Sequence, residues 1–304
     1  MFVLGNQVNL MIDGVTFDGQ YSLGDKGDTR CFYLAAGGSG DATLRLSECL
    51  VRNFNRCSDG GTDAGAAFKI AKGKLLLTDC EVSDNAATAR GAAFFSNNAA
   101  SYVVLNRCLL RENYASSAWG TAVHAANGYF CLLNTTVAGT AASASTSVTV
   151  NGDAYFFVAN STLIGASGNT NGVFRAGKNA SVVVNSLFVR GAGSRTIYAG
   201  NITSKGYNVY QSADNAWGAT SLDTDLSSES LPSALSGTAY QWTVPASISS
   251  FATTQTISSA LDSFNATGAS VIRALIDEAD FAVDGRGALR NPQKLQPGAY
   301  DAGL

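Results

Sequence analysis

The sequence predicts an all-β fold: a single-stranded right-handed parallel β-helix of about seven to eight coils with a small α-containing cap at the C-terminal end. Three observations support this prediction. A short segment recurs along the first two thirds of the chain, its apolar residues alternate, and no helix-length apolar stripe occurs before about residue 253. We expect residues 1–210 to form the β-helix and residues 211–304 to form a capping segment with short helices.

The recurring segment is strand-like and is centred on a small anchor residue. The anchors lie 34, 31, 28, 27, 26 and 25 residues apart, at Val15, Cys49, Cys80, Cys108, Thr135, Ser161 and Ser186. The segments are LMIDGVTF (10–17), LRLSECLV (44–51), LLLTDCEV (75–82), VVLNRCLL (103–110), FCLLNTTV (130–137), FFVANSTL (156–163) and SVVVNSLF (181–188). Repeats of this length indicate a solenoid, in which each unit buries its apolar face against its neighbours.

Within each unit, apolar residues stand three and five positions before the anchor and two positions after it, as Leu75, Leu77 and Val82 do around Cys80. This alternation is typical of β-strands with one buried face. A second strand follows, often a few residues after a glycine, as Phe94 follows Gly91. Two or three short strands per unit predict a coil whose strands pair with the coils above and below.

Composition limits the classes of function. The chain has 304 residues, is 46% hydrophobic but only 14% charged, and has a formal net charge of −3. This charge argues against nucleic acid as a partner. The sequence has no run of 18 apolar residues, so we expect no membrane-spanning helix. The first ten residues lack signal-peptide features, so we expect a mature or trimmed chain, although this proves nothing about the compartment. As a separate expectation, we place the protein outside the cell or at the cell surface.

The six cysteines suggest packing more than chemistry. Cys49, Cys80 and Cys108 share the anchor position, so they should stack as buried free thiols that act as small hydrophobes. Cys31 and Cys57 lie in neighbouring long loops and could form a disulfide, and Cys131 should project outward. With one histidine and no CxxC motif, the usual zinc sites are disfavoured.

The units resemble the right-handed parallel β-helix of pectin-lyase-like bacterial surface proteins. Their coils often read L-x-x-C-x-[VLF]-x-x-N followed by G-[GA]-[AG]-[IF], here Leu77 to Asn85 with Gly91 to Phe94. The ending resembles the C-terminal segment of the choice-of-anchor Q group, in Asp284, Gly287, Arg290, Gly298, Ala299, Tyr300 and Asp301. The family's hydrolases are similar to one another in N-T-D, D-D and G-H-G motifs. None of these occurs here, which disfavours a polygalacturonase-type mechanism.

After residue 253 the apolar period becomes helical. Ile257, Leu261 and Phe264 recur after Thr253, and Ile272 and Leu275 recur after Ser270, which we take as an N-cap. We expect two short amphipathic helices that fold back and cover the solenoid, because its last hydrophobic coil must be covered. In this interpretation Asp284 and Arg290 pair to lock the tail.

Aromatic and apolar residues share one outward face of the predicted coils. Positions six and four residues before each anchor alternate with the inward core positions, so their side chains should point outward. They include the candidate ligand-binding residues Tyr102, Tyr129, Tyr155 and Phe157. One reading is that the C-terminal helices or another subunit cover this face, because a bare apolar stripe is unfavourable in water. The other is that sugar rings stack on it.

A second candidate site combines charges near the N-terminal anchors: Lys74, Asp79, Arg107, Glu48 and Arg45. A polysaccharide lyase needs a cation to neutralise a uronate and a basic group to remove its α-proton. The alternative is that these residues form ordinary surface ion pairs. The Asp/Gly-rich loops offer oxygen ligands for calcium, a possible cofactor, at Asp25, Asp28, Asp59 and Asp63, without a known calcium-site spacing.

A third outward row holds Lys69, Phe95, His124, Asn151 and Arg175. His124 has the residue type of a general base, but a histidine without a nearby partner in the sequence is interpreted as a surface residue. Three hypotheses follow: a secreted or surface protein that binds a polysaccharide or glycan without cleaving it, a polysaccharide lyase, and an adhesive or structural protein that self-associates or recognises a cell-surface protein.

Overall fold

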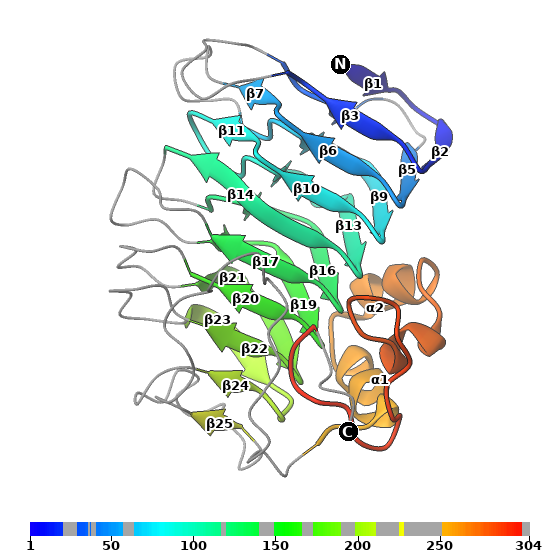
Figure 1. The fold of residues 1–304 in the computed structure, drawn as a ribbon, viewed down its shortest axis with the longest axis vertical. Helices are drawn as coiled ribbons and strands as arrows, with labels where there is room; N and C mark the ends of the chain where they lie inside the picture. Colours follow the sequence, from blue (N-terminus) through cyan, green and yellow to red (C-terminus); the bar gives the residue numbers. More distant parts are fainter. Residues whose placement is uncertain are drawn as a thin grey trace.

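A computed structural model describes residues 1–20, 29–35, 37, 41–56, 64–116, 120–139, 149–165, 173–189, 198–210, 225–227 and 251–299. These residues form a parallel β-solenoid with two short α-helices near the C-terminus (Figure 1). The predicted fold class is confirmed. Among the described residues, no helix is long and apolar enough to cross a membrane.

About five turns of the solenoid form, fewer than the seven to eight that the anchors predicted. The sequence count treated each anchor as a full coil, whereas the last repeats contribute only short strands to the second sheet. The last two, β24 (Val209–Tyr210) and β25 (Leu226–Ser227), have two residues each. Because β25 pairs with β24, at least one strand beyond residue 210 joins the sheet.

The first sheet has 14 strands in the order β1-β4-β8-β12-β15-β18-β21-β19-β16-β13-β9-β5-β2, with β23 paired to β21. Its first arm is β1 (Phe2–Leu4), β4 (Phe32–Leu34), β8 (Phe68–Ile70), β12 (Phe94–Ser96), β15 (Val123–Ala125) and β18 (Val150–Gly152). Its second arm is β2 (Asn9–Asp13), β5 (Thr43–Ser47), β9 (Gly73–Thr78), β13 (Ser101–Asn106), β16 (Tyr129–Leu133) and β19 (Tyr155–Ala159). The two arms meet at β21 (Phe174–Val184), which also pairs with β23 (Tyr198–Ser204).

The second sheet has 11 strands and continues each coil after the anchor. Its main path is β3 (Thr16–Asp18), β6 (Leu50–Arg52), β10 (Glu81–Ser83), β14 (Leu109–Ala115), β17 (Thr136–Gly139), β20 (Thr162–Ile164), β22 (Leu187–Val189), β24 and β25. Two short strands, β7 (Asn55–Arg56) and β11 (Ala86–Ala87), pair beside β14. Every pairing between the named strands is parallel and joins corresponding residues of neighbouring coils, as expected for stacked repeats.

The inward rows form one apolar core that runs along the solenoid. Phe68 and Phe94 stack with ring centroids 4.9 Å apart, and Phe32 continues the stack. Cys49, Cys80 and Cys108 are buried free thiols in this core, which confirms the predicted ladder. Cys31 is also buried and free, and its predicted partner Cys57 lies outside the described residues.

In later coils the anchor ladder becomes a ladder of hydroxyl groups. The backbone N–H of Cys108 donates to Oγ1 of Thr135, the N–H of Thr135 to Oγ of Ser161, and the N–H of Ser161 to Oγ of Ser186, each over 3.2 Å. These side chains are fully buried, so each hydroxyl must be paired to offset its desolvation. The change from Cys to Thr and Ser therefore preserves the packing and adds bonds between coils.

The residue before each anchor turns the corner between the two sheets in the left-handed backbone region. Its φ lies between 47° and 54° at Glu48, Asp79, Arg107, Asn134, Asn160 and Asn185. Asparagine tolerates this conformation better than most residues, because its short side chain bonds to nearby backbone. The corner is therefore a structural position, and charged residues occupy it only in the earlier coils.

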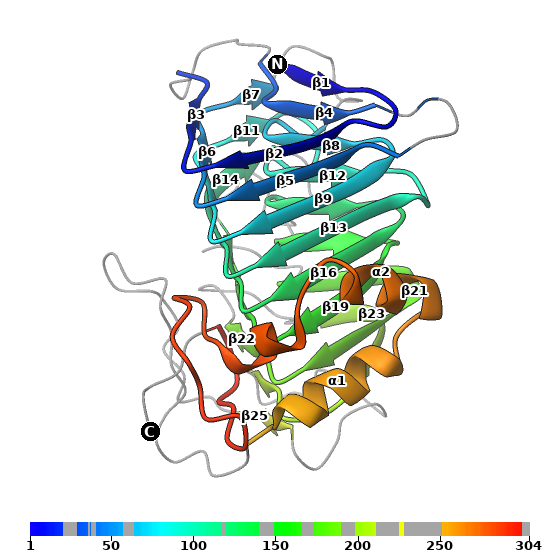
Figure 2. The ribbon, with the colours of Figure 1, turned by 90° about the vertical axis from the view of Figure 1, so that its right-hand side faces the viewer.

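The C-terminal cap begins with α1 (Thr254–Asp262) and α2 (Ala266–Arg273), followed by a 3₁₀ helix, η2 (Glu278–Ala282). Thr253 caps α1 through reciprocal bonds with Thr256. The second helix forms as predicted, but its predicted N-cap was wrong: Asn265 is the N-cap, and Ser270 lies inside the helix. Figure 2 shows the helices lying across the lower coils of the solenoid, in front of β16, β19 and β21.

Candidate functional site

The predicted aromatic face exists, and the C-terminal cap covers much of it. The rings of Tyr102, Tyr129 and Tyr155 stack with centroids 5.0 and 5.1 Å apart. Phe264, which follows α1, packs on this face, with its ring centroid 5.6 Å from that of Phe157. Phe157 is fully buried, so a sugar could reach its ring only if the cap moved away.

A second apolar cluster explains why the cap docks here. The outward stripe that runs from Leu76 to Val182 through Val104, Cys131 and Phe157 is buried with the apolar sides of α1 and α2. Cys131 projects outward as predicted, yet it is buried under the cap. Of the two readings of this face, the structure shows coverage by the C-terminal helices.

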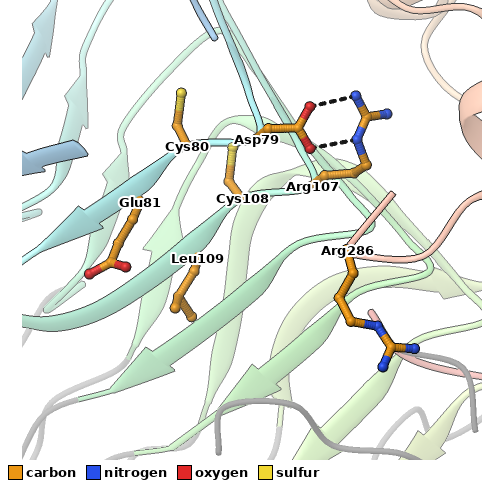
Figure 3. A pocket seen from close by; sticks show the side chains of 8 residues that line it. Asp79, Cys80, Glu81, Arg107, Cys108, Leu109 and Arg286 are labelled. Carbon is orange, nitrogen blue, oxygen red and sulfur yellow. Dashed lines mark hydrogen bonds and ion pairs between the residues drawn. The ribbon is translucent and has the colours of Figure 1, made fainter. Parts of the chain in front are cut away.

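The predicted charged cluster is divided between the two ends of a strand. Asp79 and Arg107 form a two-bond ion pair, with both N···O distances at 2.8 Å (Figure 3). Lys74 lies near the other end of β9, about 16 Å from Asp79 at the usual rise per strand residue. Arg45 lies on β5 in register with Leu76. These residues therefore do not converge on one reacting group.

Arg107 forms an ion pair with the C-terminal cap. Its Nη1 lies 2.6 Å from Oδ1 of Asp280 in η2, and the hydrogen bonds to Asp79 and Asp280 raise its pKa despite partial burial. Glu48 stands at the same corner one coil before Asp79; it is exposed and makes no side-chain bond to the described residues. The alternative reading of this cluster as ion pairs thus accounts for Asp79 and Arg107.

A cavity of about 320 Å³ lies beside this ion pair, between the corner of the coils and the C-terminal tail. Arg286 reaches toward it from the tail, and Glu81 and Leu109 line the other side (Figure 3). The lining charges are paired: Glu81 with Arg111 and Arg286 with Asp284. The cavity therefore lies between the solenoid and the tail, and each of these two ion pairs stays on one side of it.

The tail lock differs from the predicted pair. The carboxylate of Asp284, buried at 1% exposure, binds Arg286 and accepts bonds from the backbone N–H groups of Arg286 and Ala288. Arg290 instead donates to the backbone oxygens of Gln296, Gly298 and Ala299. The prediction of an Asp284–Arg290 pair was wrong because the turn places Arg286 next to the carboxylate.

The third outward row, on the first arm of the 14-stranded sheet, has the mixed chemistry of a ligand surface. We call it the mixed row and define it by the residues in register on successive strands: Tyr33, Lys69, Phe95, His124, Asn151 and Arg175. Tyr33, Lys69, Phe95 and Arg175 are half-buried, while His124 and Asn151 are buried. The expectation that His124 is an exposed surface residue was therefore wrong.

Neighbouring coils hold the side chains of the mixed row in place. Lys69 Nζ lies 5.3 Å from the ring centroid of Tyr33, and Arg30 approaches the same ring at 5.7 Å. Phe95 and His124 stack with ring centroids 5.8 Å apart. Because the Lys69–Tyr33 and Phe95–His124 contacts join adjacent coils, the rings keep fixed orientations along the row.

The lower end of the mixed row opens into a cavity of about 330 Å³, lined by Arg90, His124, Ala126, Asn151, Gly152, Asp153 and Arg175. Asn151 bonds to both of its neighbours: Arg175 Nη1 donates to its Oδ1 over 3.2 Å, and its Nδ2 lies 3.3 Å from Nδ1 of His124. Burial, followed by the positive charge of Arg90, lowers the pKa of His124 to about 4. The imidazole is therefore neutral at pH 7.

The predicted calcium ligands Asp25, Asp28, Asp59 and Asp63 lie outside the described residues. Among the residues that the structure describes, no group of three or more His, Cys, Asp or Glu side chains is arranged to hold a metal ion.

Comparisons with protein-family models, with curated proteins and with solved structures find no match for this chain.

Proposed function

We propose that the protein binds an extended polysaccharide along the mixed row without cleaving it. One observation carries the proposal: aromatic rings and hydrogen-bonding groups stand at equivalent positions of successive coils, in register. Adjacent strands lie about 4.8 Å apart, so the six residues span about 24 Å. A regular polymer can meet such a row with repeated, equivalent contacts.

The mixed row combines the contacts that a sugar polymer requires. Tyr33 and Phe95 are half-buried rings that can pack on the C–H faces of sugars, while Lys69 supplies a donor between them. Ligand sites usually join apolar surface with a few fixed polar groups. The fixed orientation of these side chains lowers the entropy lost on binding.

The alternative of a polysaccharide lyase has less support from the geometry. Arg107 is held by Asp79 and Asp280, and Lys74 lies at the end of β9 that is far from Asp79. Lys74, the candidate base, therefore does not stand next to the cation that would neutralise a uronate. The resemblance to pectin-lyase-like surface proteins, and a secreted or cell-surface location where polysaccharides are met, remain parts of this proposal.

The test is a polysaccharide screen of the intact chain, with ultraviolet absorbance of unsaturated product followed in the same wells. We expect binding without absorbance change, and a loss of at least about tenfold in affinity in Phe95→Ala and Tyr33→Ala. Tyr102→Ala is the matched comparison from the other aromatic stack. If Tyr102→Ala abolishes binding and Phe95→Ala does not, the ligand lies on the tyrosine face and the proposal fails.

Absorbance growth that Lys74→Ala abolishes would make the protein a lyase. Absence of binding to any polysaccharide, with the protein folded by circular dichroism, would reject glycan recognition.

Self-association is a second candidate function, favoured by the first coil. Six of the seven large hydrophobic residues exposed in the described part of the chain lie there: Met1, Phe2, Val3, Val8, Met11 and Val15, the seventh being Leu289. Met11 is 72% exposed on β2. Among the described strands, β2 pairs only with β5, so it is an edge strand of the first sheet. Sedimentation analysis of Met11→Lys tests this candidate, which predicts that the variant dissociates an oligomer formed by the unaltered chain.

A further inference from the structure

The cavity at His124 has a defined hydrogen-bond polarity, which follows from the donors around it. Arginine can only donate, so the atom of Asn151 that faces Arg175 Nη1 is the acceptor, Oδ1. The amide nitrogen of Asn151 consequently faces Nδ1 of His124. Nδ1 must then accept, and the proton of the neutral imidazole resides on Nε2.

His124 therefore presents a donor, not a base, to any ligand in this cavity. The side chain is buried at 6% exposure, and Nε2 has no partner among the described residues. Nε2 is not one of the fully buried unpaired atoms, so it is accessible from the cavity and can donate to a ligand group that supplies an acceptor. The one acceptor lone pair of this tautomer, on Nδ1, is already occupied by Asn151.

The charged side chains that line the cavity also favour a ligand group that accepts hydrogen bonds. Arg90, which is exposed, and Arg175, which stands two coils beyond His124, both line the cavity. Two guanidinium groups therefore lie near the imidazole. The carboxylate of Asp153 also lines the cavity, but its Oδ1 accepts the backbone N–H of Lys178 over 3.2 Å. The chain as a whole carries a formal charge of −3, whereas the cavity is lined by two arginines and one aspartate. The local charge is therefore opposite in sign to the overall charge.

We infer that this cavity binds an anionic oxygen group, a carboxylate or sulfate substituent, through Nε2–H of His124 and the guanidinium groups of Arg90 and Arg175. The inference rests on the proposed function in one respect: it assigns the substituent to a polysaccharide held along the mixed row. Charge-assisted bonds from planar guanidinium groups match such oxygens in geometry. The cavity then selects acidic over neutral polymers.

The test uses nuclear magnetic resonance of the full chain labelled with ¹⁵N-histidine, because His124 is the only histidine. At pH 7 the spectrum should show a neutral ring with the proton on Nε2. Sodium acetate and sodium sulfate are added separately, at constant ionic strength set with sodium chloride. We expect at least one of the two oxyanions to shift the Nε2 resonance saturably, and the arm that does so identifies carboxylate or sulfate.

A second arm measures affinity for matched polymers: dextran, carboxymethyl dextran and dextran sulfate. The acidic polymers should bind at least about tenfold more tightly than dextran, and Arg90→Gln and Arg175→Gln should each remove most of that difference. Lys205→Gln is the control, because it removes one positive charge away from the cavity and should change affinity less than about twofold.

The outcomes separate the inference from the proposed function. Equal affinity for neutral and acidic polymers, with no shift of Nε2 by either oxyanion, would overturn the anionic site and leave glycan binding intact. Shifts by an oxyanion without binding of any polymer would support the site and reject the glycan. A proton on Nδ1, or equal effects of Arg90→Gln and Lys205→Gln, would contradict the inference.

Discussion

Nη1 of Arg107 lies 2.6 Å from Oδ1 of Asp280, although the two residues are 173 positions apart in the sequence. Arg107 stands in the left-handed corner of its coil, with φ at 54°, and Asp79 of the preceding coil holds the same guanidinium. One arginine thus joins two coils to η2 of the cap. This junction is where the cap is fixed to the solenoid.

Asp280→Asn should loosen the cap. Both side chains are mostly buried, at 16% and 19% exposure, so the loss of one partner should cost about 1–3 kcal/mol of unfolding free energy. Limited proteolysis should then cut within residues 251–299 sooner than in the unaltered chain. Asp262→Asn, which breaks an exposed pair with Arg273, is the control and should cost less than about 1 kcal/mol. Equal protection of both variants would contradict this role of Arg107.

Tyr129→Ala should destabilise the protein by about 2–4 kcal/mol, because α2 packs on this ring. The contact is close: a methyl group added at Gly268 would lie 2.5 Å from Cδ1 of Tyr129 and 2.7 Å from Cε1 of Phe264. Gly268→Ala should therefore also weaken the cap, by displacing α2. Chemical denaturation measures both effects. If Tyr129→Ala leaves the midpoint unchanged, the cap does not depend on the tyrosine stack.

Asn160→Asp should be more harmful than Asn160→Ala. The Nδ2 of Asn160 donates to the backbone oxygen of Phe281, and its Oδ1 accepts from Asn185. Alanine loses both bonds in this fully buried corner. Aspartate can still accept from Asn185, but it loses the donor to Phe281 and places a charge against the Phe281 oxygen. We expect about 2–4 kcal/mol for alanine and more for aspartate, measured as shifts in thermal unfolding. Equal effects would show that the asparagine ladder acts by backbone conformation alone.

The pKa of His124 makes stability depend on pH. Above about pH 6.5 the imidazole is neutral in both folded and unfolded chains and contributes nothing. As the pH falls from 6.5, the unfolded chain takes up the proton first, so stability is lost until the folded pKa of about 4 is reached. The full difference corresponds to about 3 kcal/mol.

His124→Gln should remove this component, so the difference in unfolding free energy between the two proteins should change between pH 7 and pH 4. Arg90, Asp153 and Arg175 face the ring and are present in both proteins, so their contributions largely cancel. Parallel stability curves over this range would show that His124 titrates alike in the folded and unfolded chains.

Strand rows and ladders could be predicted from the sequence because they follow from local rules. Alternation fixes which side chains point inward, and a stacked repeat places equivalent residues one strand spacing apart. Phe94 above Phe68 and Cys108 above Cys80 follow directly. The corner positions of Asp79 and Arg107 carried a signal as well, since later coils have asparagine before the anchor.

The fate of the outward faces could not be predicted from alternation. Alternation predicted only that the tyrosine face and the mixed row both point outward. The path of the tail shows that α1 and α2 cover the tyrosine face. His124 was interpreted as exposed because its partner Asn151 is 27 residues away and meets it only through the coil register.

The sequence by itself therefore determined the solenoid, its inward rows and the existence of a helical cap, because each depends on periodicity within one or two repeats. Only the tertiary structure decided which face the cap covers and which side chains share a cavity. Those outcomes depend on long-range contacts, such as Arg107 with Asp280, whose geometry no local pattern encodes.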